Sequence, residues 1–261
     1  MIARGRTGFA MALVMVVGVV AFGWPFLARP GSQLGELGHG SDASLVFVVL
    51  MGLLALVLLA ELSSGGMDAK SVAVLGVLAA AGGALRVLSA GTAGLEPMFF
   101  LLVIAGRVLG PVKGFMLGAL ALLTSAFLTA GVGPWTPFQM LSCGWVAMGA
   151  ALLPRVSARG ERWLLAAYGL LAGFAFGAVM DLWDWAFFQG APDLGYVAGL
   201  GAGATIARFG QFYLVTSAGY DAFRAVGNAA MIVALGPPVL ASLARLRARA
   251  SFQFVGRAAA G

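Results

Sequence analysis

The chain has 261 residues, of which 61% are hydrophobic and 10% are charged, and its mean hydropathy is +0.97. This composition excludes an ordinary water-soluble domain and predicts an all-α protein, a polytopic bundle of membrane helices. The net charge of +6 is explained by the membrane topology below and by attraction to anionic lipid. A nucleic-acid partner is therefore not expected.

Eight segments are apolar enough to be membrane helices, which need about 20 such residues each. The fourth segment is short, and Gly106, Gly110 and Pro111 favour a tilt or a break there. The first resembles a signal peptide, but Trp24-Pro25 interrupts its apolar run and no clear cleavage site follows. The eight segments cover residues 9–28, 44–62, 71–90, 98–110, 114–131, 138–154, 163–186 and 220–244.

The basic residues predict the orientation of these helices, because Lys and Arg in short loops favour the cytoplasmic side. With both termini in the cytoplasm, only Arg29, Arg86, Arg208 and Arg224 lie on outer flanks or in outer helix thirds. The inner flanks receive the other twelve: Arg4, Arg6, Lys70, Arg107, Lys113, Arg155, Arg159, Arg162, Arg245, Arg247, Arg249 and Arg257. We therefore expect a multi-pass protein of the cytoplasmic membrane.

Several kinds of catalytic centre have no basis in the sequence. There is no G-x-x-x-x-G-K-[ST] phosphate loop, no H-E-x-x-H zinc motif and no G-x-S-x-G nucleophile motif. His39 is the only histidine, and Cys143, the only cysteine, lies among small apolar residues that favour a packed thiol. We predict no enzyme activity, no metal and no cofactor.

With this orientation, the remaining polar and aromatic residues gather near the outer membrane face. Asp221, Arg224 and Asn228 share one face of the last helix, because they are spaced by three and four residues. Ionisable groups inside a membrane usually pair with each other or line a site. The predicted substrate-binding residues are Arg86, Glu96, Trp135, Gln139, Asp181, Trp183, Asp184, Asp221, Arg224 and Asn228.

Simpler roles exist for several of these residues when each is taken alone. Arg86 and Arg224 are long enough to extend to the headgroups. The tryptophans fit an aromatic belt at the membrane surface, and Asp221 fits a helix N-cap. These roles do not explain why acids, bases, amides and rings from several helices meet at one depth.

The third apolar segment carries small residues at every fourth position, namely Gly76, Ala80 and Ala84. Such a smooth stripe lets another helix approach closely. The partner helix is either a neighbour in the same chain or a helix of another subunit, and the spacing alone does not distinguish them.

Residues from about 72 to 245 resemble the substrate-specific S component of energy-coupling factor (ECF) vitamin transporters. The most specific stretch is Gly133-Pro-Trp-Thr-Pro-Phe-Gln-Met140, which follows Leu85-Arg86 and Glu96-Pro-Met-Phe-Phe. Further matches are Gly106-Arg107, Gly114-Phe115, Asp221-Ala-Phe-Arg224-Ala-Val-Gly-Asn228 and Gly236-Pro-Pro-Val-Leu240.

The resemblance implies a six-helix core that binds a vitamin-like substrate from outside and does not transport it alone. It implies three partner subunits, a membrane scaffold and two cytoplasmic ATPases, and it makes Gly76, Ala80 and Ala84 candidates for the coupling interface with the scaffold. Rings, acids and a few bases suit a vitamin-like heterocycle, such as a cobalamin-related compound or a thiamine-like cation. The expected parts are a two-helix extension (1–66), the core (67–250) and a cytoplasmic tail (251–261).

The chain departs from this family in two segments. The first two apolar segments and their connector, which holds Arg29, Glu36, His39 and Asp42, are additional to the core. The long segment 189–219 contains a predicted short amphipathic helix within 205–218. Two roles remain open for it: a lid over the site and a packing helix at the membrane surface.

Two other functions remain open from the sequence. A self-sufficient secondary transporter would not need the partner subunits, although no clear inverted repeat is visible. An intramembrane enzyme acting on a lipid would use Asp181 and Asp184, or Glu96, as acid and base.

Overall fold

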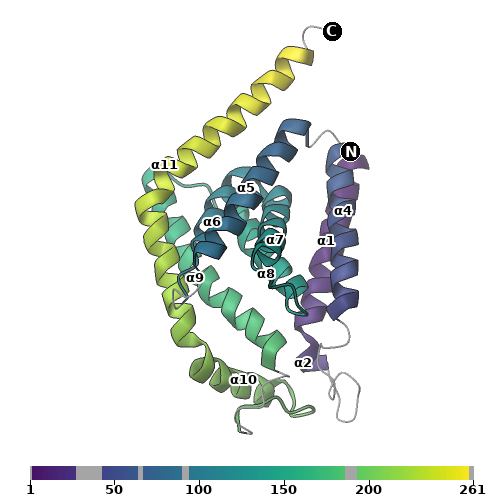
Figure 1. Ribbon diagram of the computed structural model, residues 1–261, viewed down its shortest axis with the longest axis vertical. Helices are drawn as coiled ribbons and strands as arrows, with labels where there is room; N and C mark the ends of the chain where they lie inside the picture. Colours follow the sequence, from purple (N-terminus) through teal and green to yellow (C-terminus); the bar gives the residue numbers. More distant parts are fainter. Residues whose placement is uncertain (1, 28–42, 64–66, 90–93, 186–192, 259–261) are drawn as a thin grey trace.

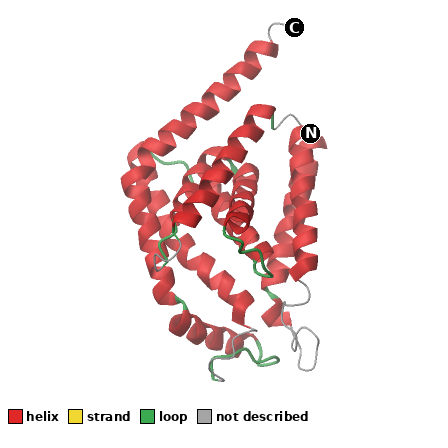
Figure 2. Cartoon of the chain, viewed as in Figure 1, coloured by secondary structure: helices red, strands yellow, loops and turns green. Residues whose placement is uncertain are grey.

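The protein is built from helices alone in the residues that the computed structural model describes, which are 2–27, 43–63, 67–89, 94–185 and 193–258 (Figure 1). Figure 2 shows loops and helices but no strand in these ranges. Each apolar segment predicted from the sequence overlaps a helix, so the all-α class is confirmed. The helices are α1 (Ile2–Phe22), α2 (Trp24–Leu27), α4 (Ala43–Ser63), α5 (Ala69–Leu88), α6 (Pro97–Leu109), α7 (Pro111–Leu128), α8 (Thr136–Leu152), α9 (Ala158–Asp184), α10 (Ala202–Thr216) and α11 (Ala218–Ala258).

Four of these helices are long and apolar enough to cross a membrane: α5, α7, α9 and residues 218–248 of α11. The apolar stretches of α1, α4 and α6 are shorter. Large apolar side chains point outward around the bundle, including Val48, Val77 and Leu171, each about two-thirds exposed. An apolar outer surface over apolar helices is compatible with a multi-pass membrane protein. The predicted number of eight spans stays a prediction.

Helix α6 forms the centre of the bundle and contacts α5, α7, α8, α9 and α11. Its sequence is apolar on every side, so every residue from Met98 to Gly106 is buried. A helix that is hydrophobic all round is stable only when other helices surround it. Helix α6 therefore fixes the positions of the others, including the ends of α9 and α11.

Glycines allow the central helices to approach until their backbones touch. A Cβ atom on Gly106 would overlap the backbone carbonyl of Ala147, and one on Gly118 would overlap that of Cys143. Both contacts join α8 to its neighbours α6 and α7. The backbone on the other side of each contact cannot turn away as a flexible side chain can.

We predict that Gly106→Ala lowers the free energy of unfolding by about 1–3 kcal/mol, the usual cost of overpacking a core. Gly76→Ala is the matched control, because a Cβ atom there meets open space, and alanine favours a helix over glycine. Thermal unfolding in detergent measures both variants. Equal stability of the two variants would contradict the close packing of α6 on α8.

The predicted break after the fourth apolar segment lies at Gly110. This residue has a φ of 91° and separates the end of α6 from Pro111, the first residue of α7. Glycine adopts a positive φ without steric cost, and proline is favoured in the first turn of a helix. The chain therefore reverses between two helices within one residue.

Helix α11 is longer than predicted, since it has 41 residues and includes the expected boundary between residues 250 and 251. At 1.5 Å per residue it is about 60 Å long, about twice the hydrocarbon thickness of a membrane. Alanine, leucine and arginine, all strong helix formers, continue the helix beyond the apolar part. Pro237 and Pro238 lie inside it, and Figure 1 shows that it changes direction near its midpoint.

The two ends of the bundle differ in charge. Glu96 precedes α6 and Arg107 lies in its last turn, so these residues mark opposite ends. Arg107 donates from Nε to Glu161 of α9 at 2.5 Å and from its other nitrogens to the carbonyls of Leu153 and Pro154. We call this end, which includes Lys70, Lys113 and Arg247, the basic end. The acidic end carries Glu96, Asp181, Asp184 and Asp221.

Helices α1 and α4 pack against each other and against α8 at the side of the central bundle (Figure 1). The contact is tight at Gly18, where a Cβ atom would overlap the ring of Trp145. The predicted connector with Arg29, Gly31, Glu36, His39 and Asp42 lies outside the described residues. The structure thus places α1 and α4 beside the other helices.

Candidate functional site

Arg224 is the centre of a buried charge cluster at the acidic end. Its Nε donates to Glu96 Oε2 at 3.0 Å, and its Nη1 donates to Asp221. Arg224 is 6% exposed and Asp221 is 2% exposed. Three residues predicted separately from the sequence are therefore in direct contact. One cation stands between two carboxylates, and burying such charges is costly unless they are paired.

Aromatic rings surround the guanidinium of Arg224 on its other sides. Its Cζ lies 5.1 Å from the ring centroid of Phe176, 5.2 Å from that of Tyr220 and 5.7 Å from that of Phe99. Contacts of this kind stabilise a cation, and more so away from water. The rings therefore hold Arg224 in place and exclude water from the ion pairs.

Local sequence explains how α11 carries this cluster. Asp221 lies in the first turn of the helix, where a carboxylate is favoured by the helix dipole. Arg224 follows three residues later on the same face. On the neighbouring helix α9, residue 177 is glycine, and a Cβ atom there would overlap the Asp221 carboxylate. Gly177 thus provides the space in which Asp221 lies.

Several buried polar atoms near Arg224 make no hydrogen bond with the described residues. They are Asp181 Oδ2, Asp221 Oδ2, the Tyr213 hydroxyl and both amide atoms of Asn228. Asn228 lies one turn beyond Arg224 and is only 1% exposed. Leaving one such group without a partner costs about 1–3 kcal/mol, so native structures rarely retain it without a reason. A bound ligand with matching donors and acceptors would remove this cost.

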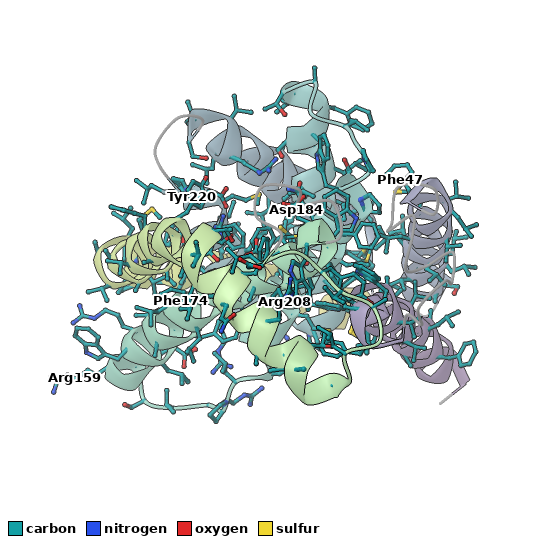
Figure 3. The ribbon with its side chains drawn as sticks, turned by 90° about the horizontal axis from the view of Figure 1, so that it is seen from below. Phe47, Arg159, Phe174, Asp184, Arg208 and Tyr220 are labelled. Atoms are coloured by element: carbon teal, nitrogen blue, oxygen red, sulfur yellow. The ribbon has the colours of Figure 1, made fainter. Side chains whose placement is uncertain are left out.

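Helix α10 crosses the acidic end of the bundle, as Figure 3 shows from below. Its Tyr213 approaches the carboxylates of Asp221 and Asp181. Burial raises the pKa of the Tyr213 phenol, and these two carboxylates raise it further. The hydroxyl therefore keeps its proton, and the Asp221 carboxylate is within its reach as an acceptor. The short helix predicted within 205–218 is confirmed, and it lies over the charge cluster.

A second group at the acidic end is aromatic. The Trp135 and Trp183 rings meet edge to face with centroids 6.4 Å apart, and Phe138 lies 5.8 Å from Trp183. Trp135 is 40% exposed, and its indole N–H donates to the Gly131 carbonyl. Its ring is thus held by its own turn with one side open. Gln139 is half-buried in the first turn of α8.

Arg86 and Asp184 are not in direct contact with the charge cluster. Arg86 donates from Nη1 to Ser125 Oγ of α7 at 3.0 Å. Asp184, labelled in Figure 3, is exposed in the last turn of α9. The structure therefore brings together Glu96, Asp221 and Arg224, with Asp181 and Asn228 next to them, and it pairs Trp135 with Trp183.

A further aromatic cluster closes the acidic end over this site. Trp185 is fully buried between Tyr196, Phe209 and Phe212, with ring centroids 5.3, 5.3 and 6.1 Å away. Its indole N–H donates to the Leu194 carbonyl at 2.8 Å. This cluster joins the end of α9 to α10. Trp185 is thus a packing residue that fixes the cover over the charge cluster.

Helix α2 is part of the same cover. The Trp24 indole donates to the Leu182 carbonyl at 3.2 Å, and its ring meets Tyr196 edge to face. The Tyr196 hydroxyl donates to the Pro25 carbonyl at 3.1 Å. The N-terminal extension therefore contacts the cover as well as the side of the bundle.

The rings of Phe99 and Phe176 and the Tyr213 hydroxyl were not among the residues predicted from the sequence. Phe99 and Phe176 occupy apolar positions and have no sequence signal that separates them from ordinary core residues. Tyr213 belongs to the predicted amphipathic helix. Its hydroxyl, on the apolar face of that helix, is the feature of the sequence that could have indicated a role in the site. Within the described residues, no group of His, Cys, Asp and Glu has an arrangement that could hold a metal ion.

The predicted coupling stripe on α5 is not covered by the described parts of the chain. Gly76, Ala80 and Ala84 are all exposed. The other face of α5 packs inward through Gly82, which meets Ala121. No neighbour within the described residues therefore covers the stripe. The remaining candidates to contact it are a helix of another subunit and lipid.

Comparison of the chain with protein families, with curated proteins and with solved structures finds no match in any of the three. Its function is therefore argued from its own residues. The acidic end combines a fixed cation, carboxylate oxygens without partners, an amide, a phenol and open aromatic surface. Such a set is suited to binding a polar, ring-containing molecule.

Proposed function

We propose that this chain is the substrate-capture subunit of an ATP-driven ECF importer and binds a vitamin-like molecule at its acidic end. The observation that carries the proposal is the buried Asn228 amide, which makes no hydrogen bond within the described residues, beside the carboxylates of Asp181 and Asp221 and a fixed Arg224. These groups belong to the last turns of α9 and the first turns of α11, under α10.

The charge asymmetry supports an outward-facing site. Lys70, Arg107, Lys113 and Arg247 lie at the basic end, which the positive-inside rule assigns to the cytoplasm. Both termini are then cytoplasmic, and the acidic end faces outward in the cytoplasmic membrane. The six helices α5–α9 and α11 form the substrate-binding core, and α1 and α4 are the additional pair.

The chemistry of the site favours a substrate with hydrogen-bond donors. Arg224 is already paired with two carboxylates, so no free cation is offered to an anionic substrate there. The unpartnered oxygens of Asp181 and Asp221 accept hydrogen bonds, and the exposed ring surface of Trp135 accepts stacking. A heterocycle bearing amino or cationic groups satisfies all of them.

Mass spectrometry of small molecules that co-purify with the detergent-solubilised chain tests this site. We expect one compound in near-stoichiometric amount and at least a tenfold loss of it in Trp135→Ala, because stacking on an indole contributes strongly to binding a ring. Trp163→Ala is the matched control, since Trp163 is exposed near the basic end. Absence of any compound, or equal retention by both variants, would refute the assignment.

The exposed stripe of α5 supports a contact with a scaffold subunit. We predict that Ala80→Leu leaves substrate binding by the lone chain unchanged but lowers ATP-dependent uptake at least tenfold. A leucine prevents the close helix approach that small residues permit. Ala167→Leu, an exposed alanine on α9, is the control and should transport normally. Equal uptake by the two variants would show that the stripe faces lipid.

A further inference from the structure

A cavity at the basic end lies between four helices and combines positive charge with apolar walls. Its volume is about 70 Å³, several times the space that one water molecule needs. Lys70 and Ser71 of α5, Lys113 of α7 and Arg247 of α11 provide its polar atoms. This cavity belongs neither to the charge cluster around Arg224 nor to the stripe on α5.

The two lysines of this cavity are not paired within the described residues. Neither Lys70 nor Lys113 has an ion pair or a hydrogen bond with the described residues, and Arg247 donates to the Val108 carbonyl. The carboxylate nearest to them is Asp68, which accepts a hydrogen bond from the Ser71 N–H at 2.9 Å. Two unpaired lysines against one carboxylate leave the mouth of the cavity positive.

The remaining walls are apolar and come from the same helices. They include Leu75 and Val108, both buried, together with Leu243 and Leu246 of α11. Helix α5 is a candidate membrane span that begins at Ala69, next to Lys70. The cavity is therefore at the level where a membrane helix starts, which is the level of lipid headgroups.

We propose that this cavity binds the phosphate of an anionic phospholipid from the adjacent leaflet, with the acyl chains along the apolar walls. Lys70 and Lys113 match an anionic phosphodiester, and the first turns of α5 and α7 add the positive ends of two helix dipoles. The apolar walls favour a lipid over a soluble phosphate. A zwitterionic lipid would bring its own cation toward the lysines and be disfavoured.

Native mass spectrometry of the full chain with phosphatidylglycerol or phosphatidylcholine tests the proposal. We expect phosphatidylglycerol to be retained preferentially, and its affinity to fall about thirtyfold in Lys70→Gln/Lys113→Gln. This corresponds to about 1 kcal/mol, or fivefold, for each basic residue near an anionic lipid surface. Arg155→Gln/Arg159→Gln is the matched control, since Arg155 before α9 and Arg159 in its first turn are both exposed and line no part of the cavity.

Three results would overturn the proposal: equal retention of both lipids, an equal loss of affinity in the control variant, or displacement of the lipid by the same concentration of inorganic phosphate. The first two would indicate general surface charge, and the third a soluble ligand. Thermal unfolding in phosphatidylcholine shows whether the double variant folds, and Lys113→Gln alone should still lose fivefold. Because the cavity and Arg224 lie at opposite ends, a failed lipid test leaves the proposed capture function unaffected.

Discussion

Replacing Arg224 with methionine is expected to lower the free energy of unfolding by about 3–5 kcal/mol, the cost of removing one partner from a buried ion pair. The change leaves the carboxylates of Glu96 and Asp221 close together without a cation. It also removes the positive charge that the rings of Phe99 and Phe176 enclose. Thermal unfolding in detergent measures the loss.

Arg86→Met is the matched control for this variant. Arg86 donates to a single hydroxyl, that of Ser125, so its loss should cost only about 1.5 kcal/mol. Adding Asp221→Asn to Arg224→Met should restore part of the stability, because it removes one of the two unpaired charges. If Arg224→Met is no less stable than Arg86→Met, the charge cluster does not hold the acidic end together.

Asn228→Leu is expected to raise stability by about 1–2 kcal/mol and to weaken substrate binding at least tenfold. The stability rises because a buried amide without hydrogen bonds is replaced by an apolar side chain of similar size. Binding weakens because the substrate loses a donor and an acceptor. Opposite changes in stability and affinity are typical of a residue kept for binding.

Unfolding temperature and equilibrium binding of the co-purified compound measure the two effects of Asn228→Leu. Ser242→Ala, an exposed position further along α11, should change neither quantity. A variant with lower stability and full affinity would assign Asn228 to packing alone. That result would remove the best support for a ligand site in this part of the bundle.

The helices of this protein could be predicted because their apolar segments are long and separated by glycine, proline and charged residues. The break between α6 and α7 at Gly110 was visible for this reason. The continuation of α11 beyond residue 250 was not visible, because the apolar run predicts the membrane span and not the end of the helix. Arginine and alanine extend a helix into water without any apolar signal.

The candidate site could be predicted only in part. The spacing of Asp221, Arg224 and Asn228 places them on one face, and the structure has them there. The ion pair between Arg224 and Glu96, 128 residues apart, depends on how α6 packs against α11, which no local pattern encodes. The hydrogen bond between Arg86 and Ser125 could not be predicted either, because a shared depth in the membrane does not show which helices are neighbours.

Transport by reconstituted vesicles tests the proposed function most directly. The co-purified compound would be offered to vesicles that contain the lone chain, or the chain with a scaffold subunit and two ATPases. We predict that the lone chain binds the compound and leaves it chemically unchanged but accumulates none, and that the complete assembly concentrates it when ATP is supplied. Accumulation by the lone chain under an ion gradient would contradict this account and identify a secondary transporter.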